Sequence, residues 1–88
     1  MNTEALACAV YRSPKKEGMY LYVLRQENPF AELPAPLLQH FGAPGHVLDL
    51  DLTPERKLAR VQVTDVIQAL RTQGFYLQMP PGEGNPDI

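Results

Sequence analysis

The 88-residue sequence has a single cysteine, Cys8, and this scarcity excludes several kinds of site. An intramolecular disulfide needs two cysteines, and a cysteine-rich zinc site needs more. A catalytic thiolate needs a positive, partly exposed setting and a nearby base, whereas Cys8 lies between alanines in an apolar stretch. We therefore predict that Cys8 is a buried structural residue.

Long apolar runs and targeting signals are also missing. The apolar run of residues 5–11 is much shorter than the ~20 residues that a membrane-spanning helix needs. Glu4 stands where a secretory signal would carry lysine or arginine. Together with the low cysteine content, these features predict a cytoplasmic protein without a membrane partner.

The charge and length of the chain set further bounds. The net charge is −2, so no global field draws the chain onto nucleic acid or anionic lipid. The apolar fraction of 44% is near that of globular proteins, and the length suits one domain, which we expect over residues 1–81. Residues 82–88 contain glycine and proline but no core-forming pattern, so we expect a flexible C-terminal tail there.

Four segments have the composition of strands. Residues 6–11 are apolar on both faces, and residues 20–24 are rich in aromatic and β-branched side chains, so the two predict a hairpin around the polar residues 13–18. Residues 46–52 alternate leucine with aspartate, which indicates a strand with one wet face. Residues 75–79 predict a final strand.

Two segments have helical patterns. Prolines at the start and Gly42 at the end predict a helix of about two turns before residue 42. Residues 63–70 have apolar side chains at helical spacing, with Thr64 as a candidate N-cap, Asp65 in the first turn and Gly74 as a left-handed stop. The predicted core consists of Leu21, Val23, Leu50, Val66, Ile67, Leu70 and Leu77.

Residues 53–61 allow two interpretations. Thr53, Pro54 and Glu55 either begin a helix or form a four-residue hairpin loop. We prefer the hairpin because most facing pairs then match, among them Asp49 with Arg60, although Asp51 would face Leu58. The resulting order, β-β-α-β-β-α-β, predicts a small α+β sandwich with a largely antiparallel sheet covered by helices.

Polar residues suited to metal binding are few. Asp49 and Asp51 lie roughly 6.5–7 Å apart on one strand face, which could begin a metal or acid/base site, but only Glu55 is near in sequence. We interpret them as a solvated face. His40 and His46 flank a short loop, yet a zinc site needs three or four ligands. We predict no metal site.

Catalytic motifs are equally scarce. Ser13 lies outside any Gly-x-Ser-x-Gly turn, and no glycine-rich phosphate loop is present. We therefore predict no catalytic residue and no cofactor, and we expect a protein that is not an enzyme.

The basic residues are the best candidates for binding, because six of the eight cations fall in two short stretches. Tyr20 and Tyr22 point to one side of the second strand and could stack on nucleic-acid bases. The alternative is two solvated turns, with Glu17 and Glu55 interleaved and the tyrosines packed under a helix. The candidate binding face consists of Arg12, Lys15, Lys16, Arg56, Lys57, Arg60, Tyr20 and Tyr22.

Three stretches resemble the YcgL-domain family of small bacterial proteins. They are residues 8–23 (CAVYRSPKKEGMYLYV), 52–60 (LTPERKLAR) and 74–81 (GFYLQMPP). The resemblance implies a compact sandwich in which helices cover β-structure. It also implies gene neighbourhoods containing ribonuclease D, which suggests by association alone a partner in RNA processing.

These observations favour a non-enzymatic binding or adaptor protein of the bacterial cytoplasm. The first alternative is an RNA-binding module that uses both basic turns, in which case RNA binding would weaken steeply as salt rises. A small hydrolase is the third hypothesis, and no constellation of residues supports it.

Overall fold

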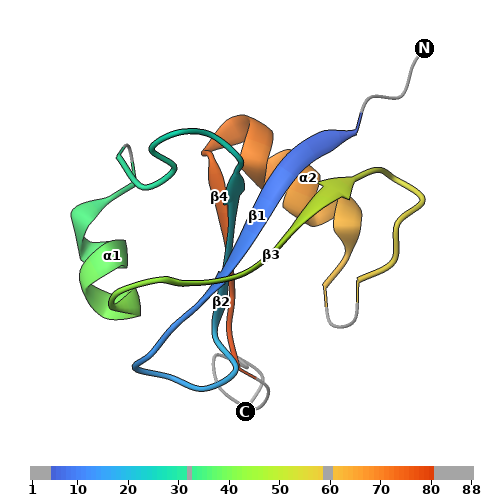
Figure 1. Ribbon diagram of the computed structural model, residues 1–88. Coiled ribbons are helices and arrows are strands. Elements are labelled where there is room, and N and C mark those ends of the chain that lie inside the picture. The colour runs from blue at the N-terminus through green and yellow to red at the C-terminus, as the bar shows by residue number, and fades with distance from the viewer. Residues whose placement is uncertain (1–4, 32, 59–60, 81–88) are drawn as a thin grey trace.

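A four-stranded antiparallel sheet with a helix on each side forms the centre of the protein (Figure 1). The computed structural model describes residues 5–31, 33–58 and 61–80. The spatial order of the strands is β3-β1-β2-β4. In chain order the elements are β1 (Leu6–Arg12), β2 (Tyr20–Leu24), α1 (Ala35–Phe41), β3 (Gly45–Leu52), α2 (Val63–Thr72) and β4 (Phe75–Gln78).

The two central strands divide the interior into two apolar clusters. Cys8 and Val10 of β1 point toward α2, where Val66 and Leu70 are buried. The intervening residue, Ala9, points to the opposite face, where it joins a cluster that includes Phe41 of α1. Successive side chains of a strand point to opposite faces, so a centrally placed β1 must be apolar on both. The prediction of an α+β fold with helices covering an antiparallel sheet is confirmed.

The first predicted hairpin is confirmed. Cys8 pairs with Leu24 and Arg12 with Tyr20. Residues 13–19 connect the two strands, and Gly18 within them has φ +89°. Glycine adopts this conformation without the steric cost that other residues meet.

The second predicted hairpin is wrong for the residues that are described. The turn itself forms, because the Arg56 N–H donates to the Thr53 carbonyl at 3.0 Å. Lys57 and Leu58 do not form a strand after it, and Leu58 packs on the α2-side cluster. Burial of Leu58 against the core is preferred over pairing at the sheet edge, so the sheet has four strands. Arg60, the expected partner of Asp49, lies outside the described residues.

Helix α2 starts two residues earlier than a Thr64 cap would require. Gln62 occupies the N-cap position and makes no side-chain capping bond, whereas Asp65 lies in the first turn as predicted. Gly74 has φ +91° and ends the helix as predicted.

Four of the seven predicted core residues are buried and three are half-buried. Leu21, Val23, Val66 and Leu70 are buried. Leu50 and Leu77 are half-buried because they lie on the two outer strands, and Ile67 because it lies at the side of α2. The predicted tail, residues 82–88, lies outside the described residues.

Candidate functional site

The loop between β1 and β2, residues 13–19, is fixed to the C-terminal end of α1 by Ser13. The Ser13 hydroxyl donates to the Phe41 carbonyl at 2.5 Å and accepts the N–H groups of Lys15 and Lys16 at 3.1 and 3.2 Å. Ser13 is 7% exposed, so these bonds form in a largely water-excluded setting. We call residues 13–19 the hairpin loop. Its backbone is held in one position by a buried hydroxyl.

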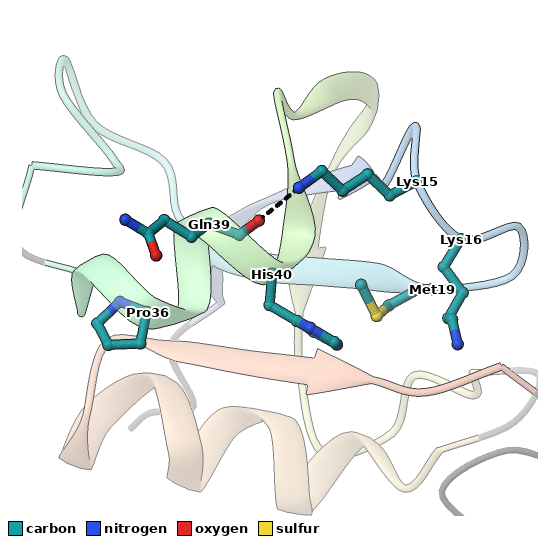
Figure 2. Close-up of a pocket in the computed structure, with 6 residues that line it drawn as sticks. All are labelled: Lys15, Lys16, Met19, Pro36, Gln39 and His40. Carbon is teal, nitrogen blue, oxygen red and sulfur yellow. Dashed lines mark hydrogen bonds between the residues drawn. The ribbon is translucent and has the colours of Figure 1, made fainter.

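Lys15 makes a second connection to the same helix. Its Nζ donates to the Gln39 carbonyl at 2.8 Å (Figure 2). A cation is favourable there because the carbonyls of the last turn carry partial negative charge. Gly42 follows with φ +87°, and a Cβ on it would lie 3.1 Å from Lys15 Cγ. Close approach of the loop to the helix end therefore depends on glycine at residue 42.

A shallow hollow of about 470 Å³ lies between the hairpin loop and α1. Figure 2 shows Lys15, Lys16 and Met19 coming from the loop side and Pro36, Gln39 and His40 coming from the helix. Met19 is 1% exposed and forms an apolar floor. We call this hollow, together with the exposed Arg12 that directly precedes the hairpin loop, the loop surface. Its ionisable side chains are basic.

Glu17 is the acidic residue next to the loop surface. It lines a second hollow of about 450 Å³ on the β3 side of the loop, where Arg12 and Tyr20 are also found. Lys15 and Lys16 therefore line the hollow on the α1 side, whereas Arg12 lies in the same hollow as the acid.

The second basic turn lies at the other end of the sheet. In the pairing of β1 with β3, Leu6 faces Leu52 whereas Arg12 faces Gly45. The turn that carries Arg56 and Lys57 follows Leu52, so β1, which is seven residues long, separates it from the hairpin loop by about 20 Å (Figure 1). Arg56 and Lys57 are exposed. The two basic turns do not form one joint face.

The two tyrosines of β2 face α2 and do not form a stacking platform. Tyr22 is 8% exposed, its hydroxyl donates to Gln78 Oε1 at 3.0 Å, and its ring packs edge-on against Tyr76. Tyr20 is half-buried and packs on the same cluster. Tyr22 therefore agrees with the alternative interpretation, in which the tyrosines pack under a helix.

Comparison with known proteins supports the family resemblance. The chain matches the model of the YcgL domain over residues 8–81. A YcgL domain-containing protein of Pseudomonas aeruginosa is 57% identical over 76 residues, which cover 86% of this chain and 77% of the relative. One of Saccharophagus degradans is 58% identical over 72 residues, or 82% and 78% of the two chains. The chain belongs to the YcgL-domain family. Both relatives are named for this domain, and neither name gives an activity.

The paired aspartates of this YcgL domain share a cation that the sequence did not reveal. Arg25 Nη2 lies 3.1 Å from Asp51 Oδ1, and Arg25 Nη1 lies 3.8 Å from Asp49 Oδ2. His46 Nε2 is 2.8 Å from the other Asp49 oxygen. Arg25 follows β2, two strands away from the aspartates, so only knowledge of the strand order could have identified it. The solvated-face interpretation holds, with Arg25 as the observed cation.

The two histidines have different neighbours. His40 lines the hollow at α1, whereas the His46 ring packs edge-on against Tyr11 at a centroid distance of 5.3 Å. The described part of the chain holds no group of three or more histidine, cysteine, aspartate or glutamate side chains that could bind a metal ion.

Cys8 is buried, as predicted, with no exposed surface. Burial removes the thiolate from water and raises the pKa of the Cys8 thiol to about 11. The thiol is therefore protonated near neutral pH, which makes it a poor nucleophile.

In the stretches 5–31, 33–58 and 61–80, neither helix has the length and apolar character needed to cross a membrane.

Proposed function

We propose that this YcgL domain is a non-enzymatic, cytoplasmic adaptor that binds an acidic patch of a partner protein through the loop surface. The observation that carries the proposal is the anchoring of the hairpin loop to α1 by Ser13 and Lys15. This anchoring fixes the backbone from which Arg12, Lys15 and Lys16 project.

Pre-organisation is the physical reason that this surface suits binding. Fixing the backbone of a flexible loop on association costs roughly 1–2 kcal/mol for each residue that becomes ordered. The backbone of the hairpin loop is already held by the three hydrogen bonds of the Ser13 hydroxyl. A partner therefore meets a preformed surface, and cations gathered on it accelerate encounter with an acidic patch.

The tyrosines favour a protein over RNA as the partner. Direct RNA binding was expected to use both basic turns together with Tyr20 and Tyr22 as stacking rings. Tyr22 is largely buried, and the register separates the two turns, so neither part of that arrangement supports an RNA interface. A protein of RNA processing, with ribonuclease D suggested by family association, remains a proposed partner.

The test is affinity purification of the tagged protein from a native host, with and without nuclease treatment. Two double variants are compared with the unaltered protein: Arg12→Glu/Lys16→Glu alters the loop surface, and Arg56→Glu/Lys57→Glu makes the same charge change at the other end of the sheet. We expect one protein partner that resists nuclease, is lost with the loop variant and is kept with the distal variant. Circular dichroism checks that both variants fold.

Two results would contradict the proposal. Loss of the partner after nuclease treatment would show that RNA mediates the contact. Equal loss with the loop and distal variants would show that general charge, rather than the loop surface, governs binding.

A further inference from the structure

Strand β3 forms one edge of the sheet and is eight residues long. Among the described residues it pairs with β1 alone, so along its outer side alternate N–H and C=O groups point away from the sheet. Proteins commonly protect such edges, because a row of unpaired backbone groups is a template for another strand. A bulge interrupts the register where Val10 and Tyr11 face β3, and the stretch 48–52 beyond it is regular.

An apolar hollow of about 360 Å³ lies beside this edge on the α2 side of the sheet. Its lining includes Tyr20, Leu50 and Leu58, together with Val47 and Leu48. Val47 and Leu48 are 42% and 43% exposed, which makes them the two most exposed large apolar residues of the described chain. We call this hollow the β3 groove. Apolar surface gathered next to an open edge is typical of an interaction site.

The other face of the same edge carries excess negative charge. Asp49 and Asp51 side chains are 47% and 60% exposed, and both share the single guanidinium of Arg25. One positive charge therefore faces two negative charges. A further cation opposite these aspartates would be favourable, since oppositely charged cross-strand pairs contribute roughly 0.2–1 kcal/mol.

We propose that the edge of β3 binds an extended segment of a partner protein as a fifth strand. Because side chains alternate between the two faces of a strand, the segment must carry two kinds of residue in alternation. Apolar side chains on one face enter the β3 groove, and lysine or arginine on the other face lies near Asp49 and Asp51. This edge is separate from the loop surface, so the inference does not depend on the proposed function.

A second copy of the same strand fits the edge less well. If the regular stretch 48–52 paired antiparallel with itself in full overlap, Leu50 would face Leu50 of the second copy. Asp49 would then face Asp51 of the second copy, twice across the interface. Like charges directly opposite each other are destabilising, so the edge selects a basic strand over its own copy.

The probe is a synthetic eight-residue peptide that alternates valine with lysine, added to the ¹⁵N-labelled protein. Its matched control alternates valine with glutamate, and a second control carries N-methyl groups that block the ladder hydrogen bonds. Amide NMR signals report where each peptide binds. Leu48→Lys places a cation on the groove side of the edge, and Met79→Lys makes a similar change at an exposed residue beyond β4.

We expect the valine–lysine peptide to shift amide signals of Gly45–Leu52 and of the β3 groove. The valine–glutamate peptide should bind more weakly, by up to roughly fivefold for each cross-strand charge pair that is lost. N-methylation and Leu48→Lys should weaken binding, and Met79→Lys should leave it unchanged. Unshifted β3 signals at about 1 mM peptide, equal binding of the two peptides, or a dimer in sedimentation that Leu48→Lys disrupts would each overturn the proposal.

Discussion

Replacing Ser13 by alanine should destabilise the protein far more than the loss of one surface hydroxyl would. The substitution removes the donor to the Phe41 carbonyl and the acceptor for two backbone N–H groups. A buried hydrogen bond contributes about 0.5–1.5 kcal/mol net, and a buried group left without a partner costs more. We therefore expect a loss of about 2–3 kcal/mol in the free energy of unfolding.

Urea denaturation followed by circular dichroism measures this loss. For a chain of this length, it corresponds to a fall in Tm of roughly 10–20 °C. Thr72→Ala is the matched control, because it removes an exposed hydroxyl that bonds the Gln68 carbonyl at 2.9 Å. That control should change stability by no more than about 0.5 kcal/mol. If the two variants were equally stable, Ser13 could not be what fixes the hairpin loop to α1.

Three further predictions concern the backbone, the thiol and the core. Gly42→Ala should lose more stability in urea than Gly74→Ala: both residues have positive φ, but a Cβ would crowd neighbours only at Gly42. Equal losses of stability in the two variants would contradict the close contact between the hairpin loop and Gly42. Because the folded pKa of Cys8 is about 11 and the unfolded value is about 8.5, its contribution to stability is complete below about pH 8.5 and declines as pH rises towards 11. Between about pH 8 and pH 10.5, the free energy of unfolding should therefore fall less in Cys8→Ala than in the unaltered protein. Parallel curves of stability against pH for the two proteins would contradict a raised pKa of the Cys8 thiol. Leu70→Ala should lower the free energy of unfolding by about 2–5 kcal/mol, measured by thermal melting. Ile67→Ala should lower it less, because Ile67 is only half-buried. The reverse order would show that the buried face of α2 is misassigned.

Local patterns were sufficient for most elements of the fold. The short apolar run of residues 6–11 and the aromatic and β-branched composition of residues 20–24 identified the hairpin, because both are typical of strands bounded by a polar turn. The spacing of Val63, Val66 and Leu70 identified the buried face of α2 in the same way.

The incorrect strand after Leu52 shows where local patterns fail. Pro54 marks a turn correctly, but a turn does not determine whether the chain returns along the sheet or crosses to the core. The destination of Leu58 was decided by α2 and the sheet, which are distant interactions. A pattern of facing pairs within one short window could not detect them.

The candidate site was predictable only in part. The clustering of Arg12, Lys15 and Lys16 was visible in the sequence, whereas their anchoring through Ser13 depends on α1 docking beside the loop. Ser13 was assessed only as a nucleophile, and a serine before proline in a turn was the available signal for a structural hydroxyl.

The most direct test of the proposed function is the affinity of the purified partner for two single charge reversals. Lys16→Glu alters the loop surface, and Lys57→Glu makes the identical change at an exposed residue about 20 Å away. Fluorescence anisotropy over a series of salt concentrations gives Kd for each variant. The account predicts that Lys16→Glu raises Kd about tenfold at low salt and flattens its salt dependence, while Lys57→Glu leaves Kd nearly unchanged. Equal Kd values for both variants and the unaltered protein, with the fold intact, would contradict it.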